Sequence, residues 1–87
     1  MKAIRFTSHA NNKFVELAQH GCSVGRSQVV AVLRRPDLVQ PGHHGRQVAQ
    51  GELDERHVLR VVFVEKEDEI VVVTFYPGRR DRYEGSV

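Results

Sequence analysis

The sequence predicts an α+β domain in which two N-terminal helices pack on one face of a twisted antiparallel sheet of about four to five strands. Two observations support this fold class. Residues 56–76, RHVLRVVFVEKEDEIVVVTFY, contain two runs of β-branched and aromatic residues joined by an acidic connection, which is the pattern of a β-hairpin. Residues 7–35 instead carry helix caps and apolar residues at helical spacing. Helices that cover the apolar side of a sheet are the economical arrangement for this order of elements.

The first part of the chain predicts a strand followed by a helix. Residues 2–6 form the strand, and Thr7 or Ser8 caps a helix that runs to about His20, because either hydroxyl can accept a hydrogen bond from a free amide of the first turn. Gly21 ends this helix, since glycine adopts the left-handed conformation without a Cβ penalty. The apolar residues of the segment share one stripe: Ala10, Phe14, Leu17 and Ala18.

A second helix and a short hairpin are expected next. Ser23 is the predicted cap of the second helix, and Pro36 fixes its end near residues 34–35. Residues 38–39 and 47–49 are short strand candidates on either side of the turn PGHHG. An edge strand formed by residues 46–50 could also pair between chains.

The main hairpin is expected to pair Val64 with Ile70, because this register gives one wholly apolar face. That face holds Leu59, Val61, Phe63, Val71, Val73 and Phe75. The opposite face holds Val58, Arg60, Val62, Val64, Ile70, Val72, Thr74 and Tyr76. Pro77 and Gly78 are expected to end the last strand, and a basic tail follows.

Size and composition predict a single folded domain over residues 1–87, with 40% hydrophobic and 28% charged residues. No apolar run is long enough to span a bilayer and no signal peptide is evident, so no membrane partner and a cytoplasmic location are expected. The lone Cys22 agrees with a reducing compartment. Arginine supplies ten of the thirteen basic residues, and its planar fork suits phosphate, so an anionic partner is plausible.

Several short motifs in a fixed order resemble a widespread family of small bacterial domains of uncharacterised function, grouped with the RelE/ParE-like toxin fold. The motifs are Phe6-Thr-Ser-His9, Gly21-Cys-Ser23, Val30 with Leu33 and Pro36, Gly45-Arg46, Leu59-Arg60-Val61-Val62 and Val72-Val73-Thr74-Phe75-Tyr76. The resemblance implies helices on one side of a curved antiparallel sheet. It also implies a toxin-like RNA-binding domain. The ribonuclease toxins of this fold are metal-independent enzymes that cut messenger RNA, free or at the ribosome, and an antitoxin protein normally binds and inhibits them.

The resemblance also marks candidate site residues. Arg60 looks like the strand arginine of the family, and the C-terminal basic and aromatic residues correspond to Arg79, Arg80, Arg82 and Tyr83. A lysine-rich cluster of the ribonucleases is represented here only by Arg46 and the His43-His44 pair.

Cleavage of RNA without a metal needs a base, an acid and a cation for the charge that develops on phosphorus. His9, Arg60 and Tyr83 are the candidates for these roles. Thr74 and Tyr76 share the face of Arg60 and could support it or touch substrate. His43, His44 and His57 lack the spacing of a metal site, so neither a metal nor another cofactor is expected.

Two interpretations remain open at this point. In the first, the chain is an endoribonuclease and the charge of Arg60 meets a phosphate from outside. In the second, it is a non-catalytic protein- or nucleic-acid-binding domain, such as a homodimer, and Arg60 is neutralised by a carboxylate of Glu52, Asp54 or Glu55. An unpaired charge in the middle of a sheet is costly, so Arg60 needs a partner under either interpretation.

Overall fold

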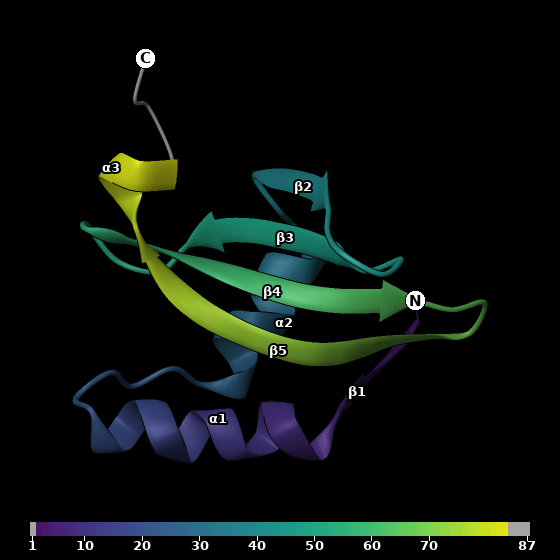
Figure 1. Ribbon diagram of the computed structural model, residues 1–87, viewed down its shortest axis with the longest axis horizontal. Helices are drawn as coiled ribbons and strands as arrows, with labels where there is room; N and C mark the ends of the chain where they lie inside the picture. The colour runs from purple at the N-terminus through teal and green to yellow at the C-terminus, as the bar shows by residue number, and fades with distance from the viewer. Residues whose placement is uncertain (1, 84–87) are drawn as a thin grey trace.

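The computed structural model describes residues 2–83, which form a five-stranded sheet with three helices (Figure 1). The elements follow in the order β1 (Ala3–Phe6), α1 (Ser8–Gln19), α2 (Arg26–Arg34), β2 (Leu38–Pro41), β3 (Gln47–Glu52), β4 (His57–Glu65), β5 (Glu69–Arg79) and α3 (Arg80–Tyr83). The predicted α+β class is therefore confirmed.

Helix α1 begins and ends as its caps predict. Thr7 is the N-cap, and its hydroxyl oxygen accepts a hydrogen bond from the backbone N–H of Ala10 at 3.1 Å. The same hydroxyl donates to the carbonyl of Val73 at 3.0 Å, which fastens the start of α1 to strand β5. After the helix, Gly21 adopts a φ of +80°, as expected of a residue that reverses the chain there.

Helix α2 begins later than predicted. Its N-cap is Gly25 and not Ser23, and the Gly25 N–H donates to the side-chain oxygen of Gln28 at 2.8 Å. A glutamine at this third helical position can satisfy the N-cap amide, so the reciprocal bond from Gln28 replaces the expected serine cap. The end at Arg34 agrees with the prediction from Pro36.

The sheet is mixed, which corrects the expectation of an antiparallel sheet. Its strand order is β1-β5-β4-β3-β2; β1 pairs with β5 in parallel, and the other three pairs are antiparallel. Parallel neighbours need a long connection, which the elements between β1 and β5 supply. Strand β3 lies inside the sheet, so the expected edge strand is also wrong: β2 forms that edge, with Leu38 and Val39 exposed.

The register of the main hairpin differs from the predicted one by one residue next to the turn, where Val64 pairs with Val71, and by a second residue beyond a bulge in β5. Arg60 pairs with Tyr76 and Val62 with Thr74, but Phe63 pairs with Val72, so one residue of β5 is extra at this point. The predicted pairing of Val64 with Ile70 is therefore wrong. Strand β5 also continues through Pro77 and Gly78 to Arg79, beyond its predicted end.

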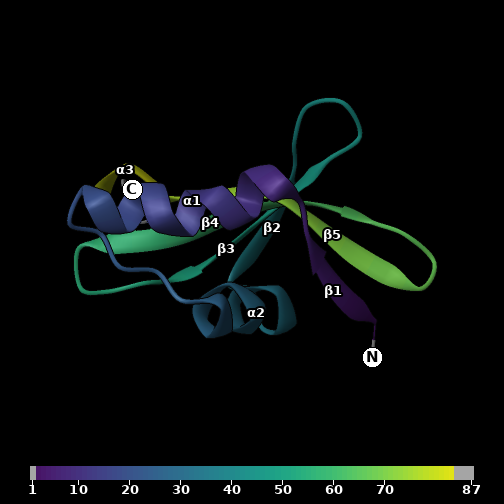
Figure 2. The same cartoon turned by 90° about the horizontal axis from the view of Figure 1, so that it is seen from below.

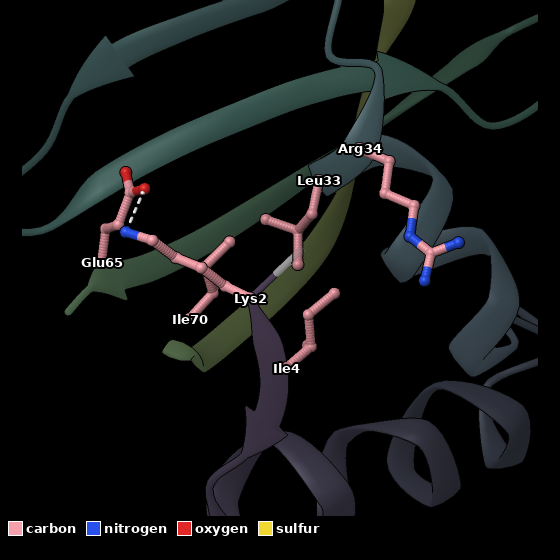
Figure 3. Close-up of a pocket in the computed structure, with 6 residues that line it drawn as sticks. All are labelled: Lys2, Ile4, Leu33, Arg34, Glu65 and Ile70. Atoms are coloured by element: carbon pink, nitrogen blue, oxygen red, sulfur yellow. Dashed lines mark hydrogen bonds and ion pairs between the residues drawn. The ribbon is translucent and has the colours of Figure 1, made fainter. Parts of the chain in front are cut away.

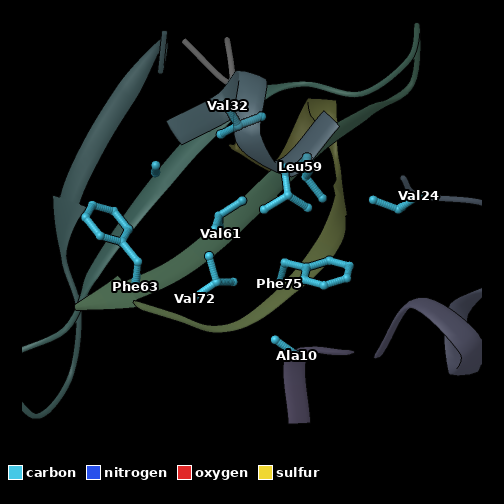
Figure 4. Packing of buried hydrophobic residues seen from close by; sticks show 10 residues of the cluster. Ala10, Val24, Val32, Leu59, Val61, Phe63, Val72 and Phe75 are labelled. Carbon is cyan, nitrogen blue, oxygen red and sulfur yellow. The ribbon is translucent and has the colours of Figure 1, made fainter. Parts of the chain in front are cut away.

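The bulge changes which residues of β5 face the helices. The core cluster contains Val72 and Phe75 from β5, although these positions would lie on opposite faces of a regular strand. Val71 and Val73, which were predicted to lie with Phe75, are not part of that cluster. Figure 4 shows this core, which comprises Ala10, Val24, Val29, Val32, Ala49, Leu59, Val61, Phe63, Val72 and Phe75.

The helices occupy different places around the sheet. Helix α2 contacts β3 and β4 and lies over one face, whereas α1 contacts mainly β5 and runs alongside it (Figures 1 and 2). The loop between β2 and β3 rises on the side of the sheet opposite α2 (Figure 2). We call that side the helix-free face, because neither of the two long helices, α1 and α2, lies over it. The short α3 does lie against it.

Candidate functional site

The helix-free face places Arg60 near the middle of the sheet. Strand alternation puts Arg60 opposite Leu59 and Val61, whose side chains lie in the core under the helices. Arg60 nevertheless has only 8% of its surface exposed. The face predicted for it is therefore confirmed, together with Thr74 and Tyr76, which pair with Val62 and Arg60 across β4 and β5.

The guanidinium of Arg60 is fixed by side chains from three other strands of the sheet: the two neighbours of β4 and the edge strand β2. Its Nε donates to the hydroxyl of Tyr76 at 3.1 Å, and its Nη2 donates to the side-chain oxygen of Gln40 at 3.3 Å. Its Nη1 donates to the side-chain oxygen of Gln50, which is itself 2% exposed. Strands β2, β3 and β5 thus each contribute one acceptor to a residue of β4.

Two aromatic rings lie against the same guanidinium. Its central carbon is 4.3 Å from the ring centroid of Tyr83 in α3 and 5.9 Å from that of Tyr76. A Cβ at Gly78 would overlap the ring of Tyr83, so the glycine allows α3 to fold this closely onto the sheet. The predicted site residues Arg60, Tyr76 and Tyr83 are therefore brought into direct contact.

No carboxylate within residues 2–83 pairs with Arg60. The acceptors of its side chain are two amides and a phenol, and the ion pairs of this part of the chain do not include it. Neutral hydrogen bonds and rings solvate the cation but leave its full charge in place. The carboxylate partners considered from the sequence, Glu52, Asp54 and Glu55, are thus not the partners of Arg60.

His9 reaches the same region from the other end of the chain. It lies in the first turn of α1, and its Nε2 is 3.1 Å from the hydroxyl oxygen of Thr74. Because Thr74 and Tyr76 are two positions apart on β5, their side chains follow one another on one face at about 7 Å. His9 with Thr74 and Arg60 with Tyr76 are therefore two polar pairs that follow one another on this face, although His9 and Thr74 are 65 positions apart.

The candidate nucleic-acid-binding arginines are not all free to bind an anion. Arg79 pairs with Asp81 at 3.1 Å on the exposed surface, and Arg80 lies 3.5 Å from a carboxylate oxygen of Glu52. Arg46 and Arg82 are exposed side chains. Arg46 lies just before β3, Arg79 ends β5, and Arg80 and Arg82 belong to α3; within residues 2–83, none of the four is a hydrogen-bond partner of the groups that hold Arg60.

Arg80 also attaches α3 to the turn between β3 and β4. Its Nη2 donates to the backbone carbonyl of Asp54 at 2.7 Å, and its backbone N–H donates to the carbonyl of Arg56 at 2.7 Å. In the same turn, the backbone N–H of Arg56 and the side chain of His57 lower the pKa of Asp54 below its ordinary value of 3.8. The two hydrogen bonds of Arg80 thus attach the start of α3, which carries Tyr83, to this turn.

A pocket of about 300 Å³ lies elsewhere, between β1, α2 and the turn end of β4 and β5 (Figure 3). Its lining includes the aliphatic side chains of Ile4, Leu33 and Ile70 and an ion pair between Lys2 and Glu65 at 2.8 Å. Its lining contains neither histidine nor a hydroxyl group. The histidine and the phenol proposed for proton transfer thus lie on the helix-free face, whereas the acid and base of this pocket, Glu65 and Lys2, are paired with each other.

Within residues 2–83, no group of three or more His, Cys, Asp and Glu side chains is arranged to hold a metal ion. In the same part of the chain, no helix has the length and apolarity needed to cross a membrane. No protein-family model matches the sequence, and no curated protein or solved structure matches it either. The geometry of the site is therefore the basis for a functional proposal.

Sequence reasoning missed Gln40 and Gln50. Both are ordinary polar residues in weakly marked strands, and their roles depend on which strand residues pair with which. One signal was available in the sequence: Gln50 directly follows the apolar residues Val48 and Ala49 in the same strand. In the structure Gln50 is fully buried, and a buried polar side chain requires a hydrogen-bond partner.

Proposed function

We propose that this chain is a toxin-like RNA-binding domain of the RelE/ParE type that acts as a metal-independent endoribonuclease. The observation that supports it best is the placement of a histidine and a nearly buried, uncompensated arginine on one helix-free sheet face. Such an arrangement lowers the stability of the fold, because burying a charge without an ionic partner is unfavourable. Functional sites are where such costs concentrate.

The proposed chemistry uses His9 and Arg60, which contact different residues of β5, so the phosphate that is cut must lie between them. His9 accepts the proton of the 2′-hydroxyl, and Thr74 holds its imidazole through the 3.1 Å hydrogen bond. The 2′-oxygen then attacks the phosphorus, and the bond from phosphorus to the 5′-oxygen of the next nucleotide breaks. Arg60 stabilises the negative charge on the phosphoryl oxygens in the transition state. The leaving 5′-oxygen takes a proton from the protonated His9 or from the hydroxyl of Tyr83.

The surrounding residues favour a long anionic ligand over a small one. Arg46, just before β3, and Arg82, in α3, are exposed cations, and they would contact phosphates beyond the one that is cut. The same proposal includes the ribosome as a location of the RNA and an antitoxin protein as inhibitor. An antitoxin would have to cover this face to block RNA cleavage.

The experiment is an RNA cleavage assay with purified protein in excess EDTA. Wild type is expected to cut single-stranded RNA and to leave 2′,3′-cyclic phosphate ends, which end-group analysis detects. His9→Gln is expected to lower the cleavage rate on the order of 10²- to 10⁴-fold, the usual contribution of a general base. An all-2′-deoxy strand of the same sequence should not be cut, because it lacks the nucleophile.

A matched control exists on the same helix. His20 is exposed at the far end of α1, and its Nδ1 contacts only the nearby carbonyl of Glu16 among the described residues. His20→Gln should therefore cleave RNA like wild type. Loss of activity in both variants, or no cleavage by well-folded wild type, would contradict the proposed catalysis.

A second candidate, a non-catalytic binding domain such as a homodimer, is favoured by strand β2. Its outer edge is unpaired among residues 2–83, and Leu38 and Val39 are exposed there by 37% and 45%. Such an edge can accept a strand from a partner chain. Light scattering of wild type beside Val39→Lys tests this candidate: a dimer that the variant converts to monomer would support it.

A further inference from the structure

The acceptors around Arg60 are all neutral, and their number leaves part of the guanidinium free. A guanidinium has five N–H donors. Three of them are used by Tyr76, Gln50 and Gln40, so two N–H donors remain on the terminal nitrogens. The ring of Tyr83 lies over the guanidinium and does not use an in-plane donor. The terminal nitrogens can therefore still donate to an oxyanion that approaches in the plane of the group.

The residue at position 50 determines whether the charge of the Arg60 guanidinium is cancelled. A glutamate has nearly the same size and shape as a glutamine, and its carboxylate would accept the same hydrogen bond from Arg60. It would also neutralise the cation in a water-poor setting, where ion pairs are strong. Glutamine keeps the hydrogen bond and the position of the guanidinium but leaves its charge uncancelled.

We propose that Gln50 and Gln40 are positioning residues that hold Arg60 as a preorganised binding site for a phosphate group of a nucleic acid strand. The inference rests on the proposed function, and it specifies how the charge of the site is preserved. Gln50 fixes the guanidinium from the buried side and Gln40 from the exposed edge strand. Because both acceptors are neutral, the entering phosphate is the first anion that the buried cation meets.

The test compares Gln50→Glu with wild type in binding a labelled 2′-O-methyl RNA strand, which cannot be cut. Fluorescence anisotropy is expected to show that Gln50→Glu binds about tenfold more weakly or worse, because the site loses its net charge. The variant should melt at the same temperature as wild type or higher, which shows that it is folded. Equal affinity of the two proteins would overturn the inference.

Two further variants make the comparison specific. Gln47→Glu introduces the same charge on the same strand, but alternation places Gln47 on the opposite face, so it should bind within about twofold of wild type. Gln40→Glu tests the site from an exposed position, where misfolding is not expected. It should weaken binding about threefold or more, and a Gln40→Glu variant that matches Gln47→Glu would count against the proposed role of Gln40.

Inorganic phosphate separates this inference from the proposed function. Phosphate is expected to shift the Nε–H signal of Arg60 in NMR spectra of wild type but not of Gln50→Glu. If phosphate binds in this way and RNA does not, the anion site stands and the nucleic-acid function fails. If wild-type Arg60 responds to neither phosphate nor the RNA strand, the inference itself is overturned.

Discussion

The two faces of strand β4 are both buried, but different groups fill them. Toward the helices, Leu59 and Val61 are fully buried among apolar side chains. On the helix-free face, Arg60 is almost as well buried, but it lies among hydrogen-bonding amides and aromatic rings. An apolar core needs only complementary volume, whereas a polar interior needs a specific partner for each donor. The first face therefore supplies apolar packing to the fold, and the second is the face to which we assign the proposed binding.

The largest expected effect on stability concerns the helix-covered face. Phe75 is fully buried, and its ring centroid lies 4.5 Å from that of Phe14. Phe75→Ala should lower the free energy of unfolding by about 3–5 kcal/mol, measured by urea denaturation. The exposed Val15 is the control, and Val15→Ala should change stability by less than about 0.5 kcal/mol. Similar losses in the two variants would show that the packing is not as described.

A smaller effect is expected where α2 meets the sheet. A Cβ at Gly51 would lie 2.9 Å from a methyl group of Val32, closer than carbon atoms pack. Gly51→Ala should therefore cost about 1–3 kcal/mol of stability through overpacking, measured by thermal or urea unfolding. Gly25→Ala is the matched control, because its Cβ would meet other atoms only at 3.8 Å. Its cost should stay below about 1 kcal/mol. A Gly51→Ala variant as stable as wild type would contradict the close approach of α2 and β3.

Thr7 connects the start of α1 with strand β5. Its hydroxyl caps α1 and donates to β5, which also positions His9 beside Thr74. Thr7→Ala should lower stability by about 1 kcal/mol and should also lower RNA cleavage, because His9 loses its fixed position. Ser8→Ala is expected to change neither property, since Thr7 and not Ser8 is the N-cap. If Ser8→Ala lowered stability and Thr7→Ala did not, Ser8 and not Thr7 would be the N-cap.

The smallest effect concerns the turn that anchors α3. The pKa of Asp54 is lowered, chiefly by the backbone N–H of Arg56 and then by His57, so its carboxylate stabilises the fold above pH 3.8 and this contribution is lost as the pH falls through the lowered pKa. Asp54→Asn should thus be less stable than wild type at neutral pH, and the two proteins should converge in acid. Circular dichroism at several pH values measures this. A difference that persists unchanged in strong acid would contradict the assignment.

The elements of the fold could be predicted from the sequence because their signals are local. Thr7 and Gly21 mark the ends of α1, and the β-branched runs around residues 65–69 mark the main hairpin. The mixed sheet and the bulge could not be predicted, because they depend on contacts between distant segments. One extra residue in β5 exchanges the faces of Val71 and Val72, and nothing in the local pattern announces it.

The same distinction applies to the site. Arg60, Thr74 and Tyr76 could be placed on one face because they lie in the strongest hairpin. The neutral environment of Arg60 could not be foreseen, since Gln40 and Gln50 are 20 and 10 positions away and reach it only through the observed strand pairing. The contact between His9 and Thr74 depends in turn on how β1 and α1 pack against β5.

The most direct test of the account is to map by NMR where a 2′-O-methyl RNA strand contacts ¹⁵N-labelled wild-type protein. We expect the amide signals of α2 to be unaffected. The shifts should concentrate on the helix-free face, at His9, Gln50, Arg60, Thr74 and Tyr83. Shifts that instead concentrate around the pocket of Ile4, Leu33 and Ile70 would contradict it, because binding would then belong to the face that we assign to stability.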